Sequence, residues 1–165
     1  MRGGRFGPKI LRMIPLDETD RRILRRLQRH GRLSNAELSE TVALSPSACH
    51  RRVARLESAG VIDRYVALLD RAALARGTTV FVEITLAGQS DGAFDAFESA
   101  VSRIPEILEC HLMAGAADYL LKVVAADAED FAALHRRTLA RLPGVARMTS
   151  SFALKRVRET AEIPV

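Results

Sequence analysis

Residues 34–65, SNAELSETVALSPSACHRRVARLESAGVIDRY, decide the fold of the first part of the chain. Ser34 is followed three residues later by Glu37, the pattern of a capping box in which each side chain accepts a hydrogen bond from the other residue's backbone amide. Leu38 and Val42, four residues apart, give the helix that begins here an apolar face. The start of the stretch therefore predicts a short amphipathic helix.

A second helix is predicted directly after the first. Ala43-Leu44 forms the turn between them. Ser45-Pro46 combines an N-cap residue with a proline at the first helical position, where its missing N–H costs nothing. The helix is expected to run to about Ser58, with Gly60 well placed as its C-cap.

The second helix has an apolar and a polar face. Cys49, Val53 and Leu56 share one side, because their spacing is i, i+4, i+7. Small polar residues and arginines occupy the rest, and such a helix can enter the major groove of DNA, where Arg binds a guanine edge and Ser or the helix N-terminus holds a phosphate. The candidate DNA-binding residues are Ser45, Ser47, His50, Arg51, Arg52 and Arg55. The alternative is an ordinary helical hairpin with a solvated basic face.

A third helix precedes the pair and completes a helix-turn-helix core. Asp17–His30 begins with acidic residues, which the helix dipole favours at an N-terminus. Ile23, Leu24 and Leu27 form its apolar stripe, and Gly31 follows its end. Its many arginines form a solvated face that is also suited to contact backbone phosphates.

The remainder of the chain alternates strand and helix patterns. Strands are predicted at 79–86, 107–113, 119–125 and 145–154, and helices at 93–104 and 127–142. The order βαββαβ is typical of a ferredoxin-like fold, a four-stranded antiparallel sheet with two helices on one face. Apolar residues on both sides of VFVEITL (80–86) indicate that a partner buries the open face, so we expect a dimer.

Several separate segments resemble one protein family. LSPSACHRRVARLESAGVIDRYVALLD (44–70), VFVEITL (80–86), ECHLMAGAADYLLKV (109–123) and TLARLPGV (138–145) are similar, in the same order, to the Lrp/AsnC (leucine-responsive, feast/famine) transcription regulators. The resemblance covers about residues 16–157. It implies an α+β protein with an N-terminal three-helix winged or helix-turn-helix domain and a ferredoxin-like effector-binding domain of the RAM type. It also implies dimers that assemble into tetramers or octamers.

The turn Gly115–Tyr119 is the second candidate site. Backbone amides at a glycine turn suit a small carboxylate and a nearby aspartate suits an α-ammonium, whereas the alternative is a plain hairpin turn with Asp118 as turn former. The resemblance makes Gly115, Asp118 and Tyr119 effector-binding residues. Ala116 stands where many members carry an acidic residue, and Ala43 stands where such turns often carry glycine with positive φ.

The predicted division of the chain follows from these assignments. It comprises a flexible basic arm (1–15), the helix-turn-helix domain (16–60), a linker strand and hinge (61–78), the effector-binding and oligomerisation domain (79–157) and a C-terminal tail (158–165). The arm could add phosphate contacts or have no role.

Charge and composition favour the same function. Through Asp70 there are 14 Lys and Arg against 8 Asp and Glu, a net charge of +6, whereas the rest of the chain has 11 against 12, a net charge of −1. Only the first part is therefore suited to meet double-stranded DNA. Cys49 and Cys110 lie far apart in apolar patterns, which indicates reduced core thiols of a cytoplasmic protein and no disulfide or metal site. The resemblance implies in addition that the protein is associated with the nucleoid.

We therefore expect a sequence-specific transcription regulator modulated by an amino acid or related metabolite, with no cofactor. An effector-independent architectural DNA-binding protein is the alternative. An enzyme is not expected, because Glu109 and His111 are too few for a metal site and no nucleophile accompanies them.

Overall fold

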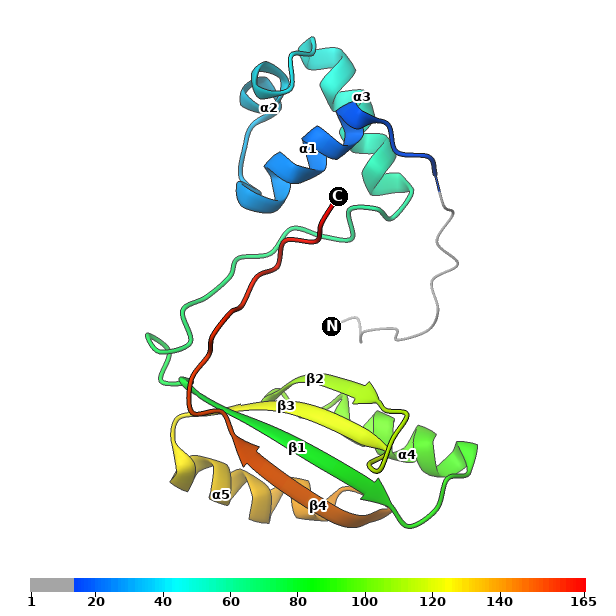
Figure 1. Cartoon of the computed structure of the whole chain (residues 1–165), viewed down its shortest axis with the longest axis vertical. Coiled ribbons are helices and arrows are strands. Elements are labelled where there is room, and N and C mark those ends of the chain that lie inside the picture. The colour runs from blue at the N-terminus through cyan, green and yellow to red at the C-terminus, as the bar shows by residue number, and fades with distance from the viewer. Residues whose placement is uncertain (1–13) are drawn as a thin grey trace. The chain divides into compact units, whose positions relative to one another are not determined.

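The computed structural model describes residues 14–165, and the chain forms two compact units (Figure 1). The first unit extends to Leu68 and also includes Arg158–Val165. The second unit is Leu69–Val157. The predicted basic arm lies outside the described residues except for its last two. No helix in the described part of the chain is long and apolar enough to cross a membrane.

The first unit contains the three predicted helices, α1 (Glu18–Arg29), α2 (Asn35–Thr41) and α3 (Pro46–Ser58). The Ser34–Glu37 capping box is confirmed, since Ser34 N donates to Glu37 Oε2 over 2.8 Å and Glu37 N donates to Ser34 Oγ over 3.3 Å. Ser45 caps α3 with Pro46 in its first turn, also as predicted. The buried core of the unit joins all three helices through Ile23, Leu24, Leu38, Val42, Cys49 and Leu56.

The turn between α2 and α3 has a left-handed residue without a glycine. Ala43 has φ 55°, and Leu44 N donates to Ser39 O over 2.9 Å across the turn. This backbone brings a methyl group close to the following carbonyl, which destabilises an L-residue relative to glycine. The turn therefore keeps the geometry that a glycine would favour.

The second unit has the predicted ferredoxin-like plan. Its strands are β1 (Thr78–Leu86), β2 (Ile107–Leu112), β3 (Tyr119–Ala125) and β4 (Val145–Phe152), its helices are α4 (Asp91–Val101) and α5 (Ala128–Arg137), and Leu139–Arg141 is a 3-10 turn. All strand pairs are antiparallel, in the order β2-β3-β1-β4. Both helices cover the same face of the sheet (Figure 1).

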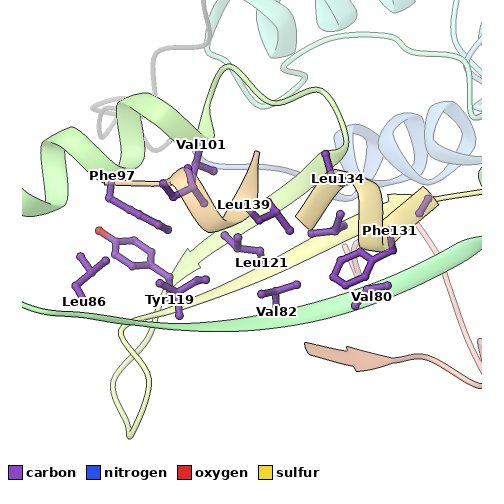
Figure 2. Close-up of a cluster of buried hydrophobic side chains, with 14 residues drawn as sticks. Val80, Val82, Leu86, Phe97, Val101, Tyr119, Leu121, Phe131, Leu134 and Leu139 are labelled. Carbon is purple, nitrogen blue, oxygen red and sulfur yellow. The ribbon is translucent and has the colours of Figure 1, made fainter. Parts of the chain in front are cut away.

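The core of the second unit lies between that face and the helices. Val80, Val82 and Ile84 alternate along β1 and are all fully buried. They pack with Phe97 of α4 and Phe131 of α5 (Figure 2). The alternation that the strand pattern predicts is therefore present on the helix side.

One helix differs from the sequence-based expectation, and two neighbouring features of the linker agree with it. The predicted helix 127–142 is wrong beyond Arg137, because Thr138 adopts φ −128° and ψ −60° and the chain continues as the 3-10 turn with Leu139 fully buried. Residues 61–69, predicted as a connecting strand or an extended linker, contain no strand, which leaves the second alternative. Gly60, the expected C-cap glycine, follows Ala59 with φ +73°, the left-handed conformation in which glycine ends a helix.

The substitution Ala43→Gly should stabilise the first unit by about 1 kcal/mol, because it removes the left-handed strain. Thermal unfolding measures the change. Ala59→Gly is the matched control, because Ala59 has φ −79° and glycine there only gains freedom in the unfolded chain, which should destabilise the unit. Equal effects of the two substitutions would contradict the assignment of strain to Ala43.

Candidate DNA-binding and ligand-binding sites

The N-terminal half of α3 presents polar groups to solvent. Ser47, His50 and Arg51 are exposed, and the Ser45 hydroxyl accepts the amide of Ala48 over 3.3 Å at the helix N-terminus. The Ser45 and Ser47 hydroxyls are 3.3 Å apart. Within the described residues, Arg51 has no ion pair. This surface is therefore open to a nucleic acid.

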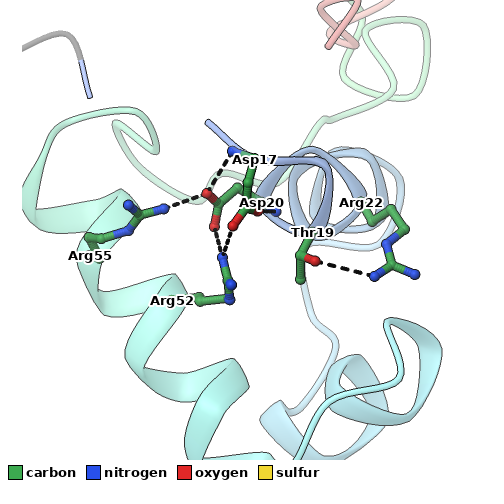
Figure 3. A network of polar contacts seen from close by, with 6 residues as sticks. All are labelled: Asp17, Thr19, Asp20, Arg22, Arg52 and Arg55. Carbon is green, nitrogen blue, oxygen red and sulfur yellow. Dashed lines mark hydrogen bonds and ion pairs between the residues drawn. The ribbon is translucent and has the colours of Figure 1, made fainter. Parts of the chain in front are cut away.

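Arg52 and Arg55, also predicted to bind DNA, are engaged inside the unit. Arg52 donates to Asp17 over 2.7 Å and to Asp20 over 2.9 Å, and Arg55 forms an ion pair with Asp20 (Figure 3). Two hydrogen bonds hold the pKa of the Asp17 carboxyl below its usual value. The larger effect comes from the backbone N–H of Asp20 and the next from the Arg52 side chain. The two arginines thus differ from Arg51 in their surroundings.

One side chain of the turn predicted to bind an effector, that of Asp118, holds the turn against neighbouring residues. Asp118 is nearly buried, and its Oδ2 accepts from Leu86 N over 2.8 Å while its Oδ1 accepts from Gln89 Nε2 over 2.7 Å. Both oxygens are therefore occupied, and the carboxylate connects the β2–β3 hairpin to the end of β1. Such buried bonds fix the shape of the turn.

Tyr119 also points into the unit. Its ring is 1 % exposed and its centroid lies 4.6 Å from that of Phe97 (Figure 2). Its hydroxyl donates to Glu98 Oε1 over 2.8 Å. Burial, reinforced by this hydrogen bond, raises the pKa of the Tyr119 phenol well above its usual value.

A cavity of about 370 Å³ adjoins the hairpin, and two of the predicted effector-binding residues, Gly115 and Tyr119, line it. Glu83 of β1 and Arg147 of β4 lie in the same lining with Met113, Thr85 and Thr149. Glu83 and Arg147 are exposed. Glu83 alternates with the buried residues of β1, and Arg147 pairs with Thr85, which shares the face of Glu83, so both lie on the face opposite the helices. The cavity therefore offers an anionic group, a cationic group and a thioether.

The sequence reasoning did not identify Glu83 or Arg147. The signal for Glu83 was present, since it is a charged residue within the apolar run VFVEITL. Arg147 becomes relevant only through the register, in which it pairs with Thr85 while Glu83 pairs with Thr149. No cluster of three or more His, Cys, Asp or Glu side chains suited to a metal occurs in residues 14–165.

Family models match both units. Residues 16–63 match a winged helix-turn-helix DNA-binding model, and residues 79–163 match the Lrp/AsnC ligand-binding domain. The chain thus combines a helix-turn-helix DNA-binding domain with a ligand-binding domain of ferredoxin-like fold.

Individual relatives agree over nearly the whole length. The chain is 44 % identical over 150 residues to the leucine-responsive regulatory protein of Klebsiella pneumoniae and 43 % identical to that of Escherichia coli K12, covering 91 % of this chain and 92 % of each relative. A transcriptional regulator from Neisseria meningitidis, solved as its L-Met complex, has a TM-score of 0.86 and 40 % identity, with 91 % and 97 % of the two chains covered. An AsnC family regulator from Agrobacterium tumefaciens has a TM-score of 0.86 and 39 % identity, with 90 % and 97 % covered. The chain belongs to the Lrp/AsnC family of transcription regulators, which confirms the resemblance.

The substitution Asp118→Ala should destabilise the second unit by about 1–3 kcal/mol, because it leaves the buried amide of Leu86 without an acceptor. Chemical denaturation followed by far-UV circular dichroism measures this loss. Gln89→Ala is the control, since it removes only the second hydrogen bond and keeps the carboxylate on Leu86 N. An Asp118→Ala variant as stable as Gln89→Ala would contradict this structural role.

Proposed function

We propose that the protein binds specific sites in double-stranded DNA through the exposed N-terminal half of α3. The observation that carries this proposal is the exposed Arg51, which has no ion pair within residues 14–165, beside Ser47 and His50 on a helix of the helix-turn-helix type. Arg51 has the reach and the planar donors to bind a guanine edge, and Ser45 and Ser47 stand at the helix N-terminus, which favours a phosphate. Arg52 and Arg55 contribute indirectly, because their guanidinium groups are held in ion pairs with Asp17 and Asp20.

The ligand in this proposal is a free amino acid or a related small metabolite, and no cofactor is involved. The cavity at Gly115 supports this ligand, because Arg147 complements a carboxylate and Glu83 complements an α-ammonium. A cavity of this size lies in the range of small-molecule sites. Gly115 and Tyr119 line this cavity, and Asp118 acts by holding the turn.

The assembly is proposed as a homodimer that associates into tetramers or octamers. Phe81 is 38 % exposed on the open face of the sheet, so a second copy has apolar surface to cover there. Polar residues accompany it, because Glu109, Lys122 and His111 share that face. Sedimentation velocity tests the assembly, and a single species of monomer mass would contradict it. We place the protein in the cytoplasm, on the nucleoid, as a regulator rather than an enzyme.

A second candidate is an architectural DNA-binding protein that responds to no effector. Ala116, in place of the acidic residue that many members carry at this turn, favours it. Equal affinity for selected and random DNA at matched salt would support this candidate over the first.

The substitution Arg51→Ala should relax sequence preference at one base position by about 1–3 kcal/mol, because a base-edge contact carries sequence information. Competitive binding to duplexes that differ at single positions measures the preference. Arg26→Ala is the charge-matched control, since Arg26 is exposed on α1 and its loss should leave the preference unchanged. Uniform weakening by Arg51→Ala across all duplexes would make Arg51 a phosphate contact instead.

One of the common amino acids should raise the melting temperature of the purified protein. A ligand at 100 times its dissociation constant adds about 2.7 kcal/mol of apparent stability, a shift of a few degrees. Arg147→Gln and Glu83→Gln should each remove the shift, whereas Arg103→Gln, which changes the same charge away from the cavity, should keep it. Asp118→Ala is unsuited to this test, because it also removes a structural hydrogen bond. No shift with any amino acid at millimolar concentration would favour the second candidate.

A further inference from the structure

Asp20 is a fully buried carboxylate in the first turn of α1. Its Oδ1 accepts from Arg52 over 2.9 Å, and its Oδ2 accepts from Asp17 N over 3.1 Å and from Arg55 (Figure 3). Its own amide donates to Asp17 Oδ1 over 2.8 Å, which completes a capping box. One side chain thus closes the N-terminus of α1 and holds two cations of α3.

The two arginines approach Asp20 from one side of α3. Arg52 and Arg55 are three residues apart, so their side chains are neighbours on the helix surface. Their side chains remain 30 % and 44 % exposed, whereas Asp20 is 0 % exposed. The guanidinium charges therefore lie near the surface while their counter-charge lies beneath it.

The burial of Asp20 gives this contact more weight than a surface ion pair. An exposed pair such as Arg25 with Glu18 contributes little, because water screens both charges. Removing one partner of a buried pair leaves a charge without compensation in the interior. Rotation of α3 about its axis separates both arginines from Asp20 together, so the contact resists that rotation.

The same contact bears on how DNA is read. Arg51 is adjacent to Arg52 in sequence and therefore points about 100° away around the helix. The rotation that Asp20 fixes is the one that aims Arg51 outward. Asp17 and Asp20 also supply two negative charges beside two positive ones, which lowers the attraction of Arg52 and Arg55 for phosphate.

We propose that Asp20 is the positioning residue of the DNA-reading helix. It fixes the rotation of α3 through Arg52 and Arg55 and keeps these two arginines from binding phosphates irrespective of sequence. The inference rests on the proposed DNA binding by α3, and it divides the predicted DNA-binding residues into two groups. Ser45, Ser47, His50 and Arg51 meet DNA directly, and Arg52 and Arg55 act through Asp20.

A test without DNA examines the contact itself in the full chain. Thermal unfolding compares Asp20→Asn, Arg55→Gln and the double variant, and folding of each is checked by circular dichroism. The expected result is strong non-additivity, with the double variant melting no lower than Asp20→Asn alone, because one interaction is lost in both. Additive losses would overturn the proposal, whatever the protein does with DNA.

A second test measures DNA binding with a duplex selected by the wild-type protein and a random duplex of equal length. Asp20→Asn should lower the ratio of affinities for the selected and the random duplex about tenfold. The slope of log affinity against log salt concentration should also become steeper, by the amount that about one to two additional phosphate contacts for each α3 would cause. Glu37→Gln is the matched control, since Glu37 holds the same capping-box position in α2 and has the same charge but no arginine partner within residues 14–165. Its ratio and salt slope should stay within about twofold of wild type.

Two results of the second test would overturn the proposal. An Asp20→Asn variant with a lower melting temperature but the ratio and slope of Glu37→Gln would make Asp20 a residue for stability alone. A loss in Arg55→Gln confined to one base position, as expected for Arg51→Ala, would make Arg55 a direct base contact. Arg55→Gln leaves Arg52 on Asp20, so this variant keeps the comparison available if Asp20→Asn fails to fold. Absence of duplex binding by the wild-type protein would refute the proposed function, while the unfolding test still decides the Asp20 contact.

Discussion

A carboxylate that is taken out of water needs a partner for each oxygen, and this constraint shapes both units of the chain. Asp20 meets it with two arginines and a backbone amide in the first unit. Asp118 meets it with the amide of Leu86 and the side chain of Gln89 in the second. Apart from the Asp17 amide at the N-terminus of α1 itself, the partners lie outside the element of the carboxylate, so each buried carboxylate fixes how two parts of its unit meet. No buried side-chain nitrogen or oxygen among residues 14–165 lacks a hydrogen-bond partner.

This constraint also separates structural charges from those left for binding. Asp118, Arg52 and Arg55 have the chemistry expected of binding residues, yet their neighbours occupy them. Arg51, Glu83 and Arg147 are exposed and have no ion pair within the described residues. A charge without an internal partner can bind a complementary ligand without first breaking an ion pair, so only the loss of its hydration opposes the contact. In both units, a charged side chain without an internal partner is therefore better suited to recognise a ligand than one that is already paired.

Local patterns in the sequence predicted most of the fold, and distant contacts account for the differences. The Ser34–Glu37 capping box, Pro46 and the alternation along β1 act within a few residues, so the pattern alone reveals them. The direction of the Asp118 side chain depends on Leu86, 32 residues away in sequence. The break at Thr138 accompanies the burial of Leu139, which belongs to the packing of the whole unit. The resemblance indicated only that such turns often carry glycine with positive φ at this position, and the sequence did not say whether Ala43 keeps that backbone, which it does.

The C-terminal segment, Arg158–Val165, belongs to the first unit. The chain leaves the first unit at Leu68 and returns to it at Arg158, so two covalent segments join the units. Gln28 of α1 fixes the returning segment, since its Nε2 donates to Ile163 O over 3.0 Å and its Oε1 accepts from Ile163 N over 2.6 Å. Asp20 lies near the opposite end of the same helix. A helix is stiff over this length. The contact of α1 with the C-terminal segment and its contact with α3 therefore keep a fixed distance from each other. Within the first unit, α1 therefore contacts both α3, through Asp20, and the returning chain, through Gln28.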